Sequence, residues 1–492
     1  PLSTINYQLS TINYQLSTIN YQSFMKRRTF NSLPFFLLGL GLANCHLPLR
    51  SHPEITDPGI EFADANYITS SPNQIQLNWM GHWLGEDLRE NLVREVAQEF
   101  SFLHQDVNLN LKFWQELGFS HFAGAAKAIA KTIRSGKVDW DVIWLDDYLY
   151  SIVASELGEP DWGSKYLVNF AEVDGFAASQ KPFIIDDPIY RNQTGGIFVG
   201  PYIEGSYHAL FYNQAVAERL GIEIKHEGMT FEDLLGYVEA VERYNRKYNS
   251  AIAAFYESKD WVTIEYIFQN LVKSEINDFS LAKSETSSSQ KNMAVLKTFK
   301  ALESLGKFNP LIPSHRENIW IQTRHLILED RVLFYVNGTW MYSHWRGIDP
   351  IKMLKIVPVE LPVFQPTNYY LGNYETTWGV MKHSPHRDRA IQLLMTWCTP
   401  KVAEKWVRYT RNPTGIRGNL AVAEEGTDLF EQFQSNITAK YGSNINYSRN
   451  TGYLFGIKNR NLSPHLDEAM RALMTGEVTA SDAYQQILAR LS

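Results

Sequence analysis

Aromatic and acidic side chains follow directly after two apolar strand patterns in this sequence. Trp79, His82 and Trp83 come after an alternating segment, and Asp146 and Asp147 come after a second pattern that predicts a buried strand. Flat indole faces suit the apolar C–H faces of sugar rings, and carboxylate oxygens accept hydrogen bonds from hydroxyl groups. These five residues therefore predict a site that binds a small polar molecule.

Motifs of catalysis and of metal binding are missing from the sequence. His82, His104 and His121 lack the spacing of metal ligands, and no HExxH, P-loop or G-x-G-x-x-G motif occurs. No Gly-x-Ser sequence forms a credible nucleophile elbow. The two cysteines, Cys45 and Cys398, cannot build a disulfide framework or a cysteine metal site if Cys45 carries lipid. We expect no catalytic residue, no bound metal and no cofactor.

The segment Met25–Cys45 has the layout of a bacterial export signal. A basic head at 26–28 precedes the apolar run Leu33–Ala43, which is about half the ~20 residues that span a bilayer. Leu42-Ala43-Asn44-Cys45 resembles the bacterial lipobox, whose cysteine is lipidated and becomes the first mature residue. Arg27-Arg28 resembles the core of a twin-arginine signal, and both that route and the Sec route stay open. We expect a lipoprotein that is anchored through Cys45.

Three identical copies of Leu-Ser-Thr-Ile-Asn-Tyr-Gln lie upstream of this signal, at 2–8, 9–15 and 16–22. Ser, Thr, Asn and Tyr form helices poorly, so the seven-residue period does not favour a coiled coil. We interpret 1–24 as a repeat leader that is not native. A signal peptide would follow at 25–44 and a lipid-anchored tether at 45–73.

The length and charge of the remaining chain limit its architecture and its partners. Cleavage before Cys45 would leave 448 residues, which suits two lobes, and would change the formal net charge from −7 to −10. A moderately acidic surface argues against nucleic acid as a partner. The chain holds 13 Trp, 26 Tyr and 26 Phe, and we assign most of them to the core.

Strand and helix patterns alternate along the chain from residue 74. Apolar alternation predicts strands at 74–80, 107–113 and 140–145, and helical periodicity predicts helices at 86–102 and 123–135. This order implies an α/β fold with a mainly parallel sheet, in which ligands bind beyond the carboxyl ends of the strands. A second set of patterns predicts strands at 207–212, 332–336 and 355–363. It also predicts helices at 215–220, 261–273, 387–398, 464–475 and 480–491, and one further helix that begins after the cap residue Thr230. Residues 284–290 are predicted to form a loop.

Five groups of residues carry a family resemblance. They are Asp139–Asp146, then Ala209–Asn213 with Leu220–Ile222 and Thr230–Leu234, then Val336–Trp340, then Trp378–Met381 through Ala390–Trp397, and last Met474–Thr479 with Ala483-Tyr484. Together they resemble the extracellular solute-binding proteins of ABC importers, of the carbohydrate-binding type that includes maltose- and trehalose-binding proteins. The resemblance covers nearly all of 74–492. It implies a periplasmic-binding-protein-like α/β fold, with two α/β lobes joined by a multi-crossover hinge and a ligand cleft between them.

The resemblance also implies where the chain passes between the lobes. Lobe 1 would hold 74–206 plus 375–411, and lobe 2 would hold 207–370 plus 418–492. The crossovers would lie near 205–209, 366–374 and 411–418.

Further cleft residues follow from the same resemblance. Trp340 matches a tryptophan that stacks on a sugar ring in the family, and Trp378 lies where the chain re-enters the first lobe. The crossovers would add Tyr207, Tyr374, Glu375, Arg411 and Arg417. An arginine fork can clamp vicinal hydroxyls or a carboxylate, and it can equally form a salt bridge between lobes.

These features predict a lipid-anchored, exported monomer that captures a sugar, oligosaccharide or polyol-like osmolyte for an ABC permease. Its expected location is the periplasmic face of the inner membrane or the cell surface, and no nucleic acid is expected to bind. The same fold could instead bind a polyamine, a ferric ion or a phosphate ester. An exported glycoside hydrolase that uses Asp146 and Glu375 as its two carboxylates is a further alternative.

Overall fold

The structure is a computed structural model that describes residues 74–86, 88–119, 122–277, 287–418, 428–445, 454–455 and 462–491. The repeat leader, the signal peptide, Cys45, the tether and His121 lie outside the described residues. None of the described helices combines the length and the apolar character that crossing a membrane requires.

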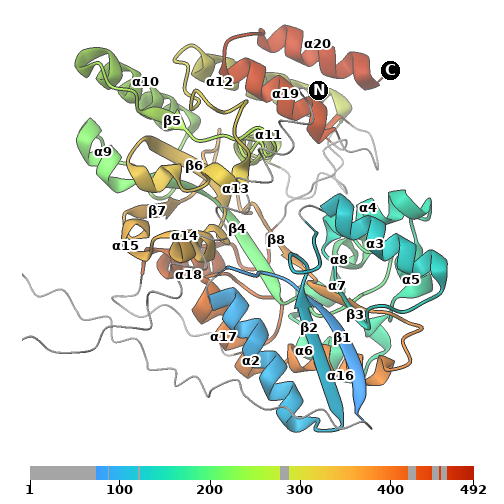
Figure 1. The fold of residues 1–492 in the computed structure, drawn as a ribbon. Helices are drawn as coiled ribbons and strands as arrows, with labels where there is room; N and C mark the ends of the chain where they lie inside the picture. Colours follow the sequence, from blue (N-terminus) through green and yellow to red (C-terminus); the bar gives the residue numbers. More distant parts are fainter. Residues whose placement is uncertain are drawn as a thin grey trace, which may run out of the picture. The chain divides into compact units, whose positions relative to one another are not determined.

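The first sheet has four strands, three of which run parallel (Figure 1). β1 (Ile75–Gly81) lies between β2 (Val107–Phe113) and β3 (Val142–Trp144), and β9 (Trp378–Val380) runs antiparallel beside β3. The predicted strands at 74–80, 107–113 and 140–145 are confirmed to within two residues. Because parallel strands end at the same edge of a sheet, the residues that follow β1, β2 and β3 come together.

Helices cover this sheet and bury one apolar stripe each. α2 (Leu88–Leu103) follows β1 and buries Leu92, Val93, Val96 and Phe100, which have the spacing of one helix face. α3 (Phe122–Ser135) follows β2, and α4 (Asp147–Leu157) follows β3. α16 (Arg387–Thr396) and α17 (Pro400–Thr410), from much later in the chain, both contact α2.

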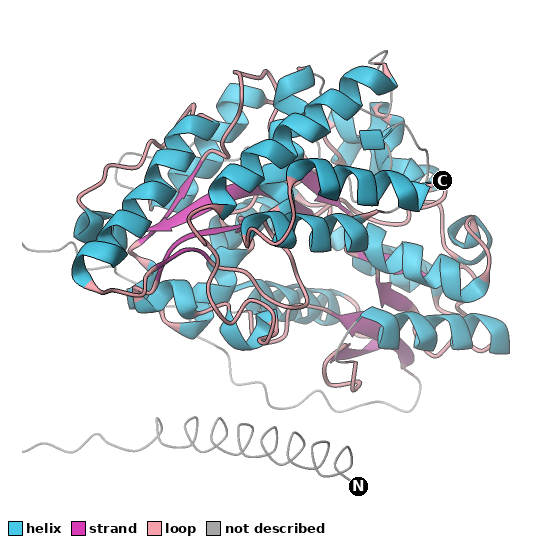
Figure 2. Cartoon of the chain, turned by 90° about the horizontal axis from the view of Figure 1, so that it is seen from above, coloured by secondary structure: helices cyan, strands magenta, loops and turns pink. Residues whose placement is uncertain are grey.

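The second sheet is built around one long strand, β4 (Glu204–Asn213). β6 (Val332–Gly338) and β7 (Ile356–Val359) pair with it on opposite sides, both antiparallel, and β5 (Ala253–Phe255) runs parallel to β6. Pro358 lies in β7 at the edge of this sheet, as expected for a residue that cannot donate to a ladder. Figure 2 shows the strands enclosed between helices.

Two helices of this lobe begin at capping boxes. α10 (Phe231–Tyr248) begins after Thr230, whose side chain accepts from the backbone of Asp233 while the Asp233 carboxylate accepts from the backbone of Thr230, which confirms the predicted cap. α12 (Ser288–Gly306) begins after an equivalent pair of Ser287 and Gln290. The prediction of a loop over 284–290 is therefore wrong for 288–290, because the polar residues there satisfy the first N–H groups of a helix.

The remaining predicted helices are confirmed, with one difference in position. The helix predicted at 261–273 is α11 (Glu265–Ile276), so it begins four residues later than expected and leaves Trp261 in the preceding loop. The other helices are α5 (Trp162–Tyr166), α6 (Phe176–Ser179), α7 (Pro182–Asp186), α8 (Pro188–Asn192), α9 (Gln214–Leu220), α13 (Trp320–Thr323), α14 (Met341–Ile348), α15 (Pro350–Met353), α18 (Leu429–Tyr441), α19 (Ser463–Met474) and α20 (Ala480–Leu491), with 3₁₀ turns η1 (Phe170–Glu172) and η2 (Leu326–Glu329).

β4 links the two sheets through its own ladder. Its first residues, 204–207, pair with β8 (Gly372–Glu375), and its later residues pair with β6 and β7. Two residues after β8 the chain forms β9 of the first sheet. The fold is therefore α/β and periplasmic-binding-protein-like, with two lobes that are joined by several segments of chain, as predicted.

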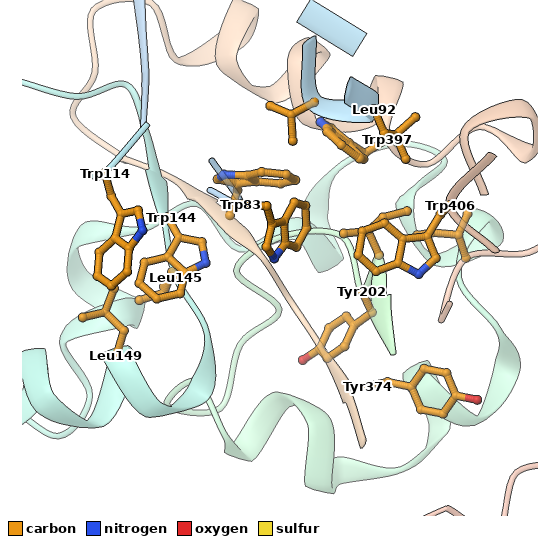
Figure 3. Close-up of a cluster of buried hydrophobic side chains, with 14 of the residues drawn as sticks. Trp83, Leu92, Trp114, Trp144, Leu145, Leu149, Tyr202, Tyr374, Trp397 and Trp406 are labelled. Atoms are coloured by element: carbon orange, nitrogen blue, oxygen red, sulfur yellow. The ribbon is translucent and has the colours of Figure 1, made fainter. Parts of the chain in front are cut away.

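A cluster of five indoles fills the first lobe beneath β1 and β9. Trp79 meets Trp378 and Trp397 edge to face, at centroid distances of 5.2 and 6.3 Å, and Trp83 lies 5.3 Å from Trp378 and 5.1 Å from Trp406. Figure 3 shows this buried cluster, with Trp83, Trp397 and Trp406 labelled. Edge-to-face contacts of this kind add to the stabilisation that burial of the rings provides.

Candidate functional site

One wall of aromatic side chains forms where the parallel strands β1, β2 and β3 end. The His82 ring stacks on Trp144, with centroids 4.0 Å apart and planes 17° apart, and Trp114 lies 4.8 Å from Trp144. Phe122 and Tyr148 pack at its rim and are half-buried, as is His82. Among the described residues, Nδ1 of His82 and the indole N–H of Trp114 have no hydrogen-bond partner. We call these five residues the lobe 1 wall.

Three of the predicted site tryptophans lie in the buried indole cluster instead. Trp79, Trp83 and Trp378 are at most 1% exposed, and the Trp378 indole N–H donates to the carbonyl of Met80 over 3.0 Å. Positions at the end of a central strand can contact a ligand, but they can also face the interior of the lobe. Here the large indole rings at these positions fill that interior. In this arrangement the three indoles are core residues, and their contact with a solute stays a prediction.

The structure brings three predicted acidic residues together between the end of β3 and β8. Asp146 caps α4 by accepting from the backbone N–H of Leu149 over 2.6 Å, and Asp147 is the first residue of that helix. One oxygen each of Asp146, Asp147 and Glu375 lies within 4.8 Å of the others. Carboxylates gathered in this way can accept hydrogen bonds from hydroxyl or ammonium groups.

The predicted tyrosines of the crossovers are buried at the shared ladder of β4 and β8. The Tyr207 hydroxyl lies 2.9 Å from that of Thr438 and 3.3 Å from that of Tyr374. Burial raises the pKa of Tyr207 and of Tyr374, so both phenols stay neutral. Tyr207 and Tyr374 therefore join the parts of the hinge to one another.

The two predicted arginines differ in their surroundings. Nε of Arg411 donates to Asp428 over 2.7 Å, and Nη2 lies 3.4 Å from Glu431, so Arg411 ties the third crossover to α18. Arg417 is exposed, and its backbone N–H donates to the carbonyl of Ser179. Of the two functions that the sequence left open for Arg411, the structure contains the salt bridge.

A second group of aromatic rings lies in lobe 2 and includes Trp340, which was predicted from the sequence. Trp340 caps α14 and lies 6.2 Å from Trp261, with planes 13° apart, and Trp261 lies 5.2 Å from Trp320. All three rings are half-buried. We call Trp261, Trp320 and Trp340 the tryptophan shelf.

Sequence reasoning missed Trp261 and Trp320. Trp261 was assigned to a helix that begins only at Glu265, and Trp320 belonged to no predicted element. Trp261 has Ile264 and Phe268 at helical spacing, so its periodicity pointed to a buried helix face. The polar pair Lys259-Asp260 directly before Trp261 is the one signal that could have placed it in a loop, and no signal singled out Trp320.

Charged side chains connect the two lobes beside the shelf. Glu86 follows β1 and accepts from Arg89 over 2.9 Å, and Oε2 of Glu86 lies 3.5 Å from Nε2 of His344 on α14. Arg89 also pairs with Glu204 at the start of β4. The His344 ring meets Trp320 edge to face at 5.2 Å. The shelf therefore adjoins this contact through Trp320, and His82 of the lobe 1 wall interacts electrostatically with Arg89 and His344 of the same contact.

Burial keeps both histidines of this region uncharged. It lowers the pKa of His344 well below its usual value, and Arg324 and Arg89 lower it further. It likewise lowers the pKa of His82, with smaller contributions from Arg89 and His344. Burial raises the pKa of Glu86, and Arg89 opposes this change. Neutral imidazoles and half-buried indoles favour a solute that is recognised by stacking and hydrogen bonds.

Comparison with protein families identifies the class of the chain. A family model described as bacterial extracellular solute-binding protein matches residues 119–428. The chain therefore belongs to this family, whose members bind solutes and are not enzymes, which confirms the prediction that the protein is not an enzyme. Comparison with curated protein sequences gave no match.

Solved structures confirm the fold at low sequence identity. A binding protein MsmE of Bacillus subtilis, in an open conformation, is 14% identical, with a TM-score of 0.58 over 86% of this chain and 98% of that chain. The protein RafE in complex with raffinose is 14% identical, with a TM-score of 0.61 over 85% and 98%. MalE3 of T. maritima with maltose bound is 16% identical, with a TM-score of 0.59 over 85% and 98%.

Replacing Trp340 and Trp378 separately by alanine distinguishes a shelf ring from a core ring. We expect Trp340→Ala to weaken solute binding about 5- to 150-fold, because it removes a stacking face worth about 1–3 kcal/mol, and to lower the melting temperature little. We expect Trp378→Ala to lower the free energy of unfolding by about 3–5 kcal/mol, because it leaves a cavity. Calorimetric titration and thermal melting measure both. Equal loss of stability in the two variants would contradict the assignment of Trp340 to an open shelf.

Proposed function

We propose that the protein is the substrate-binding component of an ABC importer and that it captures an oligosaccharide or a similar hydroxyl-rich solute. The observation that carries this proposal is the tryptophan shelf of lobe 2, which adjoins the inter-lobe contact that also interacts with His82 of the lobe 1 wall. Half-buried aromatic faces in both lobes suit the two faces of a sugar ring. Structures with bound raffinose, stachyose and maltose share this fold, which supports a sugar.

The proposal includes a route to the transporter and to the membrane. A monomer closed around its solute would deliver it to permease subunits, and the segment around Cys45 would hold it at the outer face of the membrane by acyl chains. The order of a basic head, a short apolar run and a lipobox-like sequence supports this anchor. Binding would require no cofactor.

A ligand that carries amino groups is the second candidate. The carboxylates of Asp146, Asp147 and Glu375 lie close together and favour a positively charged group, as a polyamine or an amino sugar would supply. Among the described residues, the same three carboxylates are the group of histidine, cysteine, aspartate and glutamate side chains that lie close enough to hold a metal ion, and no histidine belongs to it. We prefer a sugar to a polyamine because the three half-buried indoles of the tryptophan shelf offer flat faces for stacking. A sugar ring can cover such a face, whereas a linear polyamine covers less of it.

A thermal-shift screen of sugars, polyols and amines tests the proposed ligand class. We expect an oligosaccharide such as raffinose or stachyose to raise the melting temperature, because a ligand that binds only the folded protein stabilises it by mass action. Spermidine serves as the comparison for the amine alternative. A shift with spermidine and none with any sugar would overturn the proposed substrate.

Cell fractionation of Cys45→Ala tests the anchor separately. We expect the variant to leave the membrane fraction for the soluble fraction while its sugar affinity is unchanged, because the cysteine carries the acyl chains and lies outside the body. Cys398→Ala is the matched control and should stay with membranes. A Cys45→Ala protein that still fractionates with membranes would contradict the anchor.

A further inference from the structure

Arg324 lies at the tryptophan shelf with one buried hydrogen-bond donor that the protein leaves unused. Its Cζ lies 5.0 Å from the centroid of the Trp320 ring, and Nη1 donates to the carbonyl of Ile321 over 2.8 Å. Within the described residues, its Nε–H is buried and meets no acceptor. A buried donor that has lost water without gaining an acceptor destabilises the folded state, so its retention suggests a function.

Other buried arginines of the chain have acceptors that Arg324 lacks, although the Nε–H of Arg89 is also buried without a partner among the described residues. Arg89 pairs with both Glu86 and Glu204, Arg411 pairs with Asp428 and Glu431, and Arg471 donates to three backbone carbonyls. No carboxylate of the described residues lies within ion-pair distance of Arg324. The guanidinium of Arg324 therefore has a donor for an oxygen acceptor that comes from a bound solute.

Glu86 of the opposite lobe gives Arg324 only long-range compensation. The Glu86 carboxylate interacts favourably with the charge of Arg324, but its oxygens already contact Arg89 and His344. Arg324 thus lies between the Trp320 face and the inter-lobe contact. A solute ring that stacks on the shelf would bring its edge oxygens to this guanidinium.

We propose that Arg324 is a specificity-determining residue that binds a pair of oxygen acceptors on the solute held by the tryptophan shelf. This inference rests on the proposed function. The contact with Trp320 fixes the plane of the guanidinium, and a planar fork of N–H groups matches two neighbouring oxygens. Two sources supply such a pair, namely the vicinal hydroxyls of a neutral sugar and the carboxylate of an acidic sugar.

The test compares Arg324→Gln and Arg324→Lys with the control Arg316→Gln. Arg316 is an exposed arginine of the same lobe that pairs with Glu468 and Glu477. Calorimetric titration with raffinose and with digalacturonate measures affinity, and melting without ligand measures stability. We expect Arg324→Gln to weaken binding about 10- to 100-fold, Arg324→Lys to lose most of the same affinity because it lacks the fork, and Arg316→Gln to change nothing.

The two probes identify the source of the oxygens, and melting tests the inference without a ligand. A loss confined to raffinose assigns vicinal hydroxyls, and a loss confined to digalacturonate assigns a carboxylate. Equal affinity of Arg324→Gln and the unaltered protein would overturn the inference. Because the Nε–H of Arg324 has no acceptor and its Nη1–H bonds only to Ile321 three residues before it, Arg324→Gln should leave the ligand-free melting temperature unchanged or raised. A fall of several degrees would assign Arg324 a structural role. If the unaltered protein binds neither sugar, the proposed substrate fails, and titration of the same variants with the solute that raises the melting temperature in the thermal-shift screen decides on Arg324.

Discussion

Strand β4 carries backbone hydrogen bonds to strands on both sides of the hinge, and the position of the candidate site depends on this shared ladder. Its first residues pair with β8, which continues into the first sheet, and its later residues pair with β6, which leads to Trp340. A ladder is rigid along the strand but can twist, so the two lobes can rotate while their strand ends keep facing each other. Tyr207 and Tyr374 are buried at this joint and hold it together by their hydroxyls.

The chemistry of the site follows from burial more than from charge. His82 and His344 are uncharged because they have lost water, and the charges of Glu86, Arg89 and Glu204 largely compensate one another. The groups that we propose for contact with a solute are a set of aromatic faces, the carboxylates of Asp146, Asp147 and Glu375, and the Nε–H of Arg324. Such a surface recognises shape and hydrogen-bonding groups, which suits a neutral or nearly neutral solute.

The fold could be predicted from the sequence to a large extent, because apolar periodicity is a local property. β2 and α20 have the predicted bounds, and the cap at Thr230 was recognisable from its spacing to Asp233. The start of α12 was missed because Ser287 and Gln290 read as polar loop residues until their reciprocal hydrogen bonds are seen.

The site could be predicted only in part, because whether a tryptophan faces core or solvent depends on packing between distant segments. Trp378 and Trp79 come from opposite ends of the chain and bury each other, which no local pattern reveals. Trp340 was found through family resemblance. Trp320 and Arg324 lie on one short helix, α13 and its C-cap, but Trp261 reaches them only through a loop whose course the sequence does not specify. Buried polar groups such as Glu86 and His344 also require the opposite lobe to be in place.

In the function that we propose, the two lobes enclose the solute between the lobe 1 wall and the tryptophan shelf. Small-angle X-ray scattering of the purified protein, with and without the sugar that most raises its melting temperature, measures this closure. Closure around a solute predicts a smaller radius of gyration of the unaltered protein at saturation, and a smaller decrease in Trp340→Ala at the same sugar concentration. A saturating sugar that leaves the radius of gyration of the unaltered protein the same or larger would contradict the account.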